Sequence, residues 1–170
     1  MTVLATERLI LRIPHAVDFP ACAAFWASTR SHMMSGPLTA EQTAREFGDI
    51  LAQWRRHGFG LFTVTRRGSD QGIGGIGPFY PDTHPEPELV WSLWDAADEG
   101  KGYAFEAAVA ARDWFFATTP HRTAVSYTDV DNYRSHRLCL RIGGAVDATA
   151  QHPYGDDPTL TFRYHARGLA

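Results

Sequence analysis

Two glycines one residue apart, Gly100 and Gly102, separate an apolar run at residues 87–94 from an alanine-rich segment at residues 103–117. The apolar run has the length and boundaries of a strand, and the alanine-rich segment predicts a helix that is apolar on nearly all sides. A strand, a glycine-rich turn and a helix in this order place the free N–H groups of the helix N-terminus at the turn. Because glycine has no Cβ atom, a phosphate can approach those N–H groups. An ordinary turn has the same composition, so both interpretations stay open.

The rest of the chain alternates between strand-like and helix-like patterns. Helical spacing of apolar residues begins after the candidate caps Asp18 and Thr39, and Gln42 completes a capping box with Thr39. Gly58 is expected to end that second helix. The patterns predict helices after residues 18 and 39, at 103–117 and around 135–142, and strands at 8–13, 59–65, 72–80, 87–94, 123–129, 145–149 and 160–166. This order predicts one α/β domain, residues 1–170, with a mixed sheet and helices on both faces.

Composition argues against several functional classes. The net charge of −3 and the lack of a large Lys and Arg cluster argue against a nucleic-acid partner. No apolar run is long enough to span a membrane, and the first residues lack the pattern of a secretory signal, so a cytoplasmic location is expected. Cys22 and Cys139 are far apart and are expected to be reduced thiols. The eight histidines show no metal-ligand spacing, so no metal is expected.

The glycine motif does not fit the common nucleotide-binding fingerprints. A dinucleotide fingerprint needs a third glycine where Phe105 stands, and a P-loop needs a longer spacing before Lys and Ser or Thr. A nucleotide-binding module that uses the same turn is therefore the weaker alternative.

The string GKGYAFEA, preceded by PELVWSLW and followed after a strand by DNYRSHRLCLRIGG, resembles the GCN5-related N-acetyltransferase (GNAT) superfamily. The resemblance is to the branch that acetylates the N-termini of ribosomal proteins, and it extends from TERLILR through GIGGIG to the last two strands. It implies a single-domain GNAT fold with a mixed, mostly antiparallel sheet. It also implies that acetyl-CoA is the co-substrate and that its pyrophosphate is the anion at the glycine turn.

The resemblance also implies a set of cofactor-binding residues. In the family, a Q/R-x-x-G-x-G/A pattern surrounds the pyrophosphate, and it corresponds here to Glu99, Gly100, Lys101, Gly102, Tyr103 and Ala104. Glu99 departs from the usual Gln or Arg, so the backbone N–H groups rather than this side chain are expected to bind phosphate. The preceding strand, Val90, Trp91, Ser92 and Leu93, is expected to pair with the pantetheine arm as an added strand would. Asn132 corresponds to an asparagine beside that arm, and it is equally suited to capping the next helix.

Acetyl transfer to an amine needs a base for the amine and a proton for the leaving thiolate. Glu88 resembles the general-base glutamate of histone-acetylating relatives. Its alternative interpretation is a glutamate at the end of a strand that faces solvent. His84 is a second candidate base. Many relatives have a tyrosine acid where Cys139 stands, so Ser135, three residues after Asn132, is the candidate proton donor or a small packing residue. Cys139 is better explained by core packing than as an acetyl carrier.

The sequence therefore predicts an acetyl-CoA-dependent N-acetyltransferase that acts by direct attack of a primary amine, either a protein N-terminus or a small molecule. Acidic residues around 82–88 and at Asp156 and Asp157 are suited to attracting a cationic amine or to simple solvation. The alternative from another class is a non-catalytic acyl-CoA sensor, a reading prompted by Glu99 and by the absent tyrosine. The oligomeric state stays open, with a homodimer among the options.

Overall fold

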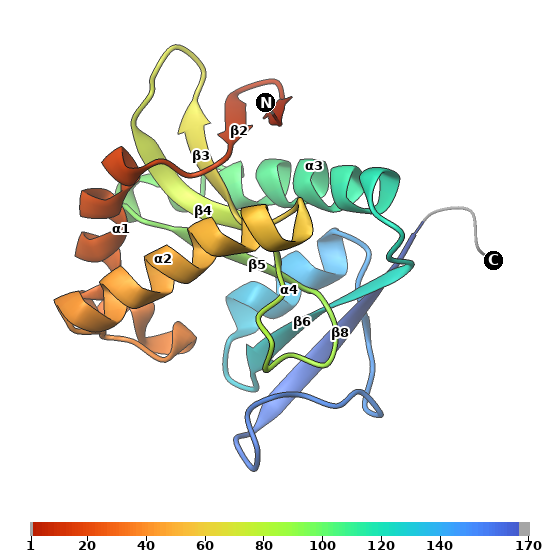
Figure 1. Ribbon diagram of the computed structural model, residues 1–170. Helices are drawn as coiled ribbons and strands as arrows, with labels where there is room; N and C mark the ends of the chain where they lie inside the picture. The colour runs from red at the N-terminus through yellow and green to blue at the C-terminus, as the bar shows by residue number, and fades with distance from the viewer. Residues whose placement is uncertain (1, 167–170) are drawn as a thin grey trace.

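One twisted sheet forms the centre of the molecule (Figure 1). The computed structural model describes residues 2–166, and within them the strand order is β1-β2-β3-β4-β5-β6-β8-β7. Neighbouring strands are antiparallel except β5 and β6, which are parallel. The strands are β1 (Val3–Ala5), β2 (Leu9–Arg12), β3 (Phe62–Arg66), β4 (Gly72–Phe79), β5 (Glu88–Leu93), β6 (Thr123–Asp129), β7 (Ala145–Val146) and β8 (Thr159–His165). The predicted mixed, mostly antiparallel sheet is confirmed.

Helices occupy both faces of this sheet. They are α1 (Phe19–Trp26), α2 (Ala40–His57), α3 (Tyr103–Thr118) and α4 (Tyr133–Arg141), with short 3-10 segments η1 (Ala16–Asp18), η2 (Thr29–Met34) and η3 (Ala96–Asp98). On β5, the side chains of Leu89 and Trp91 pack into the core beneath α3, whereas Val90 and Ser92 face α1 and α2. Because successive strand residues point to opposite faces, the two helix layers lie on opposite sides of the sheet.

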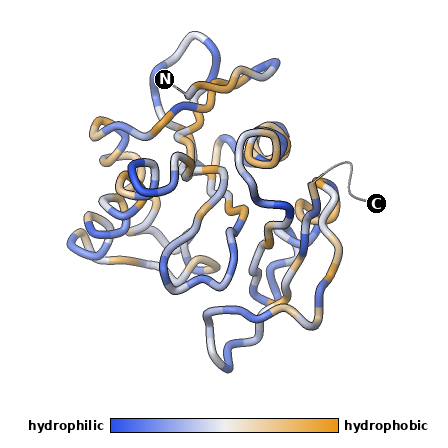
Figure 2. The backbone as a smooth tube through the Cα atoms, turned by 45° about the vertical axis from the view of Figure 1, so that its right-hand side comes forward, coloured by the Kyte–Doolittle hydropathy of each residue, from blue (hydrophilic) through white to orange (hydrophobic). Residues whose placement is uncertain are grey.

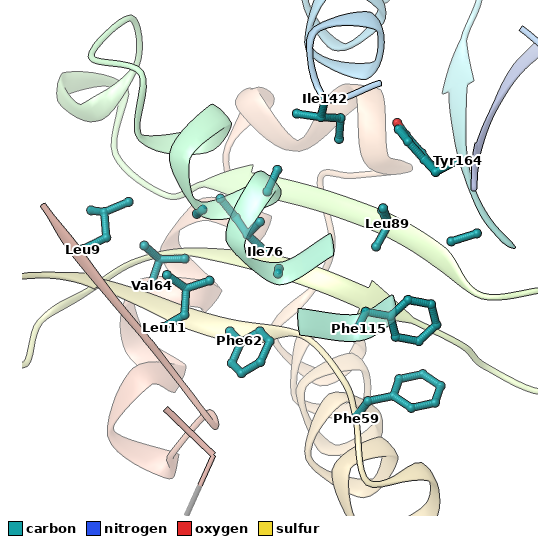
Figure 3. Close-up of a cluster of buried hydrophobic side chains, with 14 of the residues drawn as sticks. Leu9, Leu11, Phe59, Phe62, Val64, Ile76, Leu89, Phe115, Ile142 and Tyr164 are labelled. Atoms are coloured by element: carbon teal, nitrogen blue, oxygen red, sulfur yellow. The ribbon is translucent and has the colours of Figure 1, made fainter. Parts of the chain in front are cut away.

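The main apolar core lies between the sheet and α3. In Figure 3, side chains of β2, β3 and β4 gather around α3, and Ile142 and Tyr164 extend the same cluster toward α4 and β8. Figure 2 shows the contrast along the chain, since the loop before β8 is mostly hydrophilic and α2 alternates between hydrophobic and hydrophilic residues. That alternation lets α2 bury one side only, whereas α3 carries apolar residues on most sides. Burial of apolar residues on most sides thus fixes the position of α3, the helix that begins at the glycine turn.

The predicted caps have different outcomes. Thr39 and Gln42 form the expected capping box, with Gln42 N–H donating to Thr39 Oγ1 at 3.2 Å and Thr39 N–H donating to Gln42 Oε1 at 2.8 Å. Gly58 ends α2 in the left-handed conformation, as predicted. Asp18 stands at the N-cap position of α1, but the prediction that it caps this helix is wrong because its carboxylate makes no cap bond. It instead accepts hydrogen bonds from Arg12 and Thr63.

Two strand predictions differ from the structure. β1 was not predicted, because three residues are too short to show a period of two. β7 covers two residues where a strand at 145–149 was predicted. The reason is Asp147, whose carboxylate accepts hydrogen bonds from the N–H and the hydroxyl of Thr149 at 3.0 and 2.7 Å. Such a local side-chain contact turns the backbone out of the sheet.

Candidate functional site

The parallel strands β5 and β6 diverge soon after they meet. Within residues 2–166 their register is a single pair, Glu88 with Val125, and the Ser126 hydroxyl donates to the Leu89 carbonyl at 2.6 Å. The Trp94 N–H donates to the Ile73 carbonyl on the β4 side. Backbone groups alternate in direction along a strand. The amides of Trp91 and Leu93 therefore point the same way as that of Leu89 and face the gap beside β6. The strand that resembles the pantetheine-binding segment thus has an edge that a ligand can pair with.

The glycine turn lies at the end of that strand and begins α3. Gly100 and Gly102 have φ angles of 75° and 81°, a left-handed conformation that favours glycine. Gly102 is the N-cap residue of α3, and no side chain accepts from the first turn of the helix. Tyr103 and Ala104 are the first two residues of α3. The free N–H groups and the open backbone fit an anionic group such as a pyrophosphate.

Arginines from distant segments surround the turn. Arg8 donates from Nη1 to the Lys101 carbonyl at 2.9 Å, and its Nη2 lies 3.3 Å from where a Cβ atom on Gly102 would stand. Lys101 itself is directed toward Asp98, with 3.4 Å between Nζ and Oδ1. Sequence reasoning missed Arg8 because it is 93 residues from Lys101 and no local pattern connects them. The two meet through the packing of β2 against α3.

Glu99 has a role that its sequence position did not suggest. Its carboxylate pairs with Arg30 at 2.5 Å and with Arg134 at 2.8 Å, and these arginines lower the pKa of Glu99. Arg30 also donates to the carbonyls of Leu93 and Trp94 at the end of β5. Glu99 therefore holds two cations beside the turn where relatives use Gln or Arg, and the Arg134 side chain is largely exposed there.

Glu88 is buried at the point where β5 and β6 separate. Its side chain is 6% exposed, and its Oε1 accepts a hydrogen bond from the Tyr127 N–H at 3.2 Å. His84 Nε2 lies 3.2 Å from Glu88 Oε2, and His84 Nδ1 lies 3.2 Å from the Thr83 hydroxyl. Burial raises the pKa of Glu88, while His84 and the Tyr127 N–H offset part of the rise. The solvent-facing alternative for Glu88 is therefore wrong, and the two candidate bases are direct neighbours.

Helix α4 brings Asn132 and Ser135 to the opposite side of the gap. Asn132 Oδ1 accepts from the Ser135 N–H at 3.2 Å, so Asn132 caps α4. The Ser135 hydroxyl accepts from Trp91 Nε1 at 3.2 Å, which ties α4 to β5 across the gap. Because the oxygen accepts this bond, the hydroxyl hydrogen stays available to another acceptor.

Cys139 is fully buried in the core, and burial raises its pKa to about 11. A thiol in this state is a poor nucleophile, so the structure agrees with core packing. Two tyrosines lie near the candidate bases. Tyr127 and Tyr154 approach His84, with ring centroids 5.8 and 6.1 Å away, and burial raises the pKa of both phenols. Sequence reasoning missed them because they come from β6 and from the loop before β8.

Part of the predicted acidic cluster is neutralised. Glu86 pairs with Arg163 at 2.5 and 2.8 Å, and Asp82 pairs with Arg56 at 2.7 Å. Asp156 and Asp157 are exposed in the loop before β8. Glu88 differs from Glu86 and Asp82, because within residues 2–166 no Lys or Arg forms an ion pair with it. In the same part of the chain no three acidic, His or Cys side chains are grouped as metal ligands.

The mostly antiparallel sheet has one parallel pair, β5 and β6, and a left-handed glycine turn stands between β5 and α3. Residues 8–145 match the family model described as Acetyltransferase (GNAT) domain. An acetyltransferase structure from Agrobacterium tumefaciens is 41% identical, with 97% of this chain and 95% of that chain covered and a TM-score of 0.91. The chain belongs to the GNAT acetyltransferase family, whose members use acetyl-CoA, and the predicted N-acetyltransferase class is confirmed. The family match favours an enzyme over a non-catalytic sensor and over a nucleotide-binding module.

More distant structures share the fold. A GNAT-family acetyltransferase from Bordetella pertussis is 20% identical, covers 96% of this chain and 99% of its own, and has a TM-score of 0.79. RimL, a ribosomal alpha-N-protein acetyltransferase solved in complex with coenzyme A, is 14% identical, with 97% and 98% covered and a TM-score of 0.78. A comparison with curated protein sequences found no match. No helix among residues 2–166 has the length and apolar character needed to cross a membrane.

Proposed function

We propose that the protein transfers the acetyl group of acetyl-CoA to a primary amine, of a protein N-terminus or of a small molecule, by direct attack. The observation that carries this proposal is the buried Glu88 carboxylate at the divergence of β5 and β6, with no cationic Lys or Arg partner in the described residues. A carboxylate with a raised pKa is suited to accept a proton from an ammonium or an attacking amine near neutral pH.

The proposed cofactor site combines the turn and the strand edge. The N–H groups of Gly102, Tyr103 and Ala104 bind the pyrophosphate, with Gly100 giving the turn its shape. Lys101 and Arg8 lie beside the turn and are paired with Asp98 and Glu106. The pantetheine arm pairs with β5 along Val90, Trp91, Ser92 and Leu93, beside Asn132 and Ser135 of α4. Glu99 contributes by holding Arg30 and Arg134.

The proposed reaction is a single displacement. The amine nitrogen forms a bond to the thioester carbonyl carbon, the carbon–sulfur bond breaks, and Glu88 takes the proton that the amine loses. The thiolate of CoA takes a proton from the Ser135 hydroxyl, which solvent then reprotonates. The Trp91 indole holds the Ser135 oxygen, which leaves the hydroxyl hydrogen free to point to the sulfur. His84 orients the Glu88 carboxylate.

A substitution at the turn tests the cofactor site. Gly102→Val places a branched side chain against Arg8 and over the helix N-terminus, so acetyl-CoA affinity measured by calorimetry is expected to fall at least tenfold. Gly58→Val is the matched control, since Gly58 has a similar φ of 73° and a Cβ atom added there meets no atom within 4 Å. Equal affinity in the two folded variants would mean that the pyrophosphate binds elsewhere.

The cytoplasmic location and the homodimer stay predictions from the sequence. The acceptor is tested by following CoA thiol release with peptides, amino acids, polyamines and aminoglycosides.

A further inference from the structure

An apolar cavity lies on the face of the sheet opposite the main core. It is bounded by α1, η2 and α2 above and by β3, β4 and β5 below. Its walls include Trp26, Met34, Phe47, Val90 and Trp94. None of the residues described as lining it carries a charge.

The cavity has a closed floor and a partly open rim. Phe47 and Cys22 on its inner side are almost completely buried, whereas Met34 and Trp94 are half-buried. The cavity has a volume of about 40 Å³. Because one water molecule needs roughly 10 to 15 Å³ of such volume, the cavity holds about three or four non-hydrogen atoms.

The two hydroxyl groups of the lining already have partners inside the protein. The Thr63 hydroxyl donates to Asp18 at 2.9 Å, and the Ser92 hydroxyl donates to the Gly75 carbonyl at 3.4 Å. A cationic ligand group would therefore lose its hydration here without a side-chain acceptor to compensate, whereas an alkyl group would leave water at no such cost.

The cavity is connected to the proposed reaction centre by β5. Glu88, Val90 and Ser92 alternate with the core-facing residues of that strand, so their side chains lie on one face. Two residues along a strand span about 7 Å. An amine whose nitrogen is next to Glu88 therefore extends its substituent along this face of β5 toward Val90, which lines the cavity.

We infer that this cavity binds the side chain of the acceptor, and that the acceptor is a primary amine with a short, uncharged, apolar substituent next to the amino group. The inference rests on the proposed amine acetylation and narrows its substrate class. Both an N-terminal residue such as valine and a free apolar amino acid amide have this chemistry. Polyamines and aminoglycosides place further cations where the cavity offers no polar partner.

An acceptor series measures this specificity. Short peptides that differ only in the first residue, Gly, Ala, Val, Leu, Lys or Asp, and the matching free amino acid amides are compared by kcat/KM for CoA release. Each methylene group buried in the cavity is expected to raise kcat/KM about fourfold up to the size of valine or leucine. Lys and Asp peptides are expected to fall at least tenfold below valine. The comparison of peptides with amides separates a protein N-terminus from a free amine.

Variants of the cavity give a second measurement. Gly75→Ala adds a methyl group that meets Ser92 and Trp94 at 3.7 Å, so it fits without strain and reduces the space. It is expected to lower the leucine-to-glycine ratio of kcat/KM at least fivefold, whereas Met34→Ala widens the rim and raises this ratio. Gly48→Ala, on the exposed side of α2 with no atom within 4 Å, is the matched control and leaves the ratio unchanged.

The outcomes separate the inference from the proposed function. Acetylation of Lys or Asp peptides as fast as of valine peptides, or a Gly75→Ala effect that is equal for all acceptors, overturns the inference and leaves amine acetylation standing. If no acceptor releases CoA, amine acetylation fails. Binding of valine amide, followed by the fluorescence of Trp26 and Trp94, then decides the cavity: binding that weakens in Gly75→Ala supports it, and no binding overturns it as well.

Discussion

Two buried carboxylates on this fold, Asp18 and Glu88, are in opposite electrostatic states. Both residues are almost completely buried, at 2% and 5% exposed. Asp18 receives two hydrogen bonds of 2.8 Å from Arg12, one from the His15 N–H and one from the Thr63 hydroxyl, and these contacts lower its pKa. Glu88 receives one backbone hydrogen bond and has His84 as its neighbour, so burial dominates and its pKa is raised.

The difference supports a structural role for Asp18 and the proposed catalytic role for Glu88. Asp18 joins β2, β3 and the start of α1, and its charge is fully compensated. Glu88 is at the only point in the described residues where β5 and β6 pair, and its charge is not compensated by a cation. An uncompensated buried carboxylate lowers stability, and such groups are concentrated at functional sites.

The largest expected effect is on stability. Asp18→Asn leaves the half-buried Arg12 guanidinium without its counter-ion, and breaking a buried pair costs about 3 to 5 kcal/mol at most. Urea unfolding at pH 7 measures this loss. Glu88→Gln breaks no ion pair with Lys or Arg and is expected to leave stability equal or higher. A loss as large for Glu88→Gln as for Asp18→Asn would remove the distinction between the two sites.

The second effect is on activity. Glu88→Gln keeps the size of the side chain and its acceptor for the Tyr127 N–H but removes the base, so kcat is expected to fall about 100-fold or more near neutral pH. The rate recovers partly at higher pH as more of the amine becomes neutral. Steady-state assays of CoA release measure this, with acetyl-CoA affinity as the control that stays unchanged. Nearly full activity in a folded Glu88→Gln variant contradicts its role as the base.

The pH dependence of stability sharpens the comparison. The lowered pKa of Asp18 contributes stability above the ordinary aspartate pKa of about 3.9, and this contribution is lost as pH falls through the lower folded-state pKa. The raised pKa of Glu88 acts in the opposite direction, because the folded state resists ionisation as pH rises from about 4.3 through the higher folded-state pKa. Denaturant midpoints from pH 3 to pH 8 therefore show that Glu88→Gln gains stability relative to the parent as pH rises. A constant difference over this range contradicts the raised pKa.

The smallest expected effect concerns His84. Removing its contact in His84→Gln withdraws one group that lowers the pKa of Glu88, so the acid limb of kcat/KM is expected to move to higher pH. At neutral pH the rate falls by only a few fold, about 2- to 10-fold on the scale of a lost hydrogen bond. A pH–rate profile of both variants measures this. If His84→Gln costs as much as Glu88→Gln at every pH, His84 is the base.

Local sequence patterns determined much of the architecture. The capping box at Thr39 and the left-handed end at Gly58 follow from contacts within a few residues, and so does the glycine turn before α3. Such features depend on backbone conformation that neighbouring side chains set. The cap predicted at Asp18 failed because Arg12 and Thr63, from two strands, compete for the same carboxylate.

Only the tertiary structure decided the electrostatics of the site. From the sequence, Glu88 was as suited to solvent as to catalysis, and its burial depends on Tyr127 of β6 and on His84 of the preceding loop. Glu99 looked like a loss of a phosphate contact, and the fold shows that it holds Arg30 and Arg134 from segments 69 and 35 residues away. Sequence sets which residue types are available at each turn and strand. The pKa of a carboxylate depends on burial and on charges brought together from distant parts of the chain, and these exist only once the chain has packed.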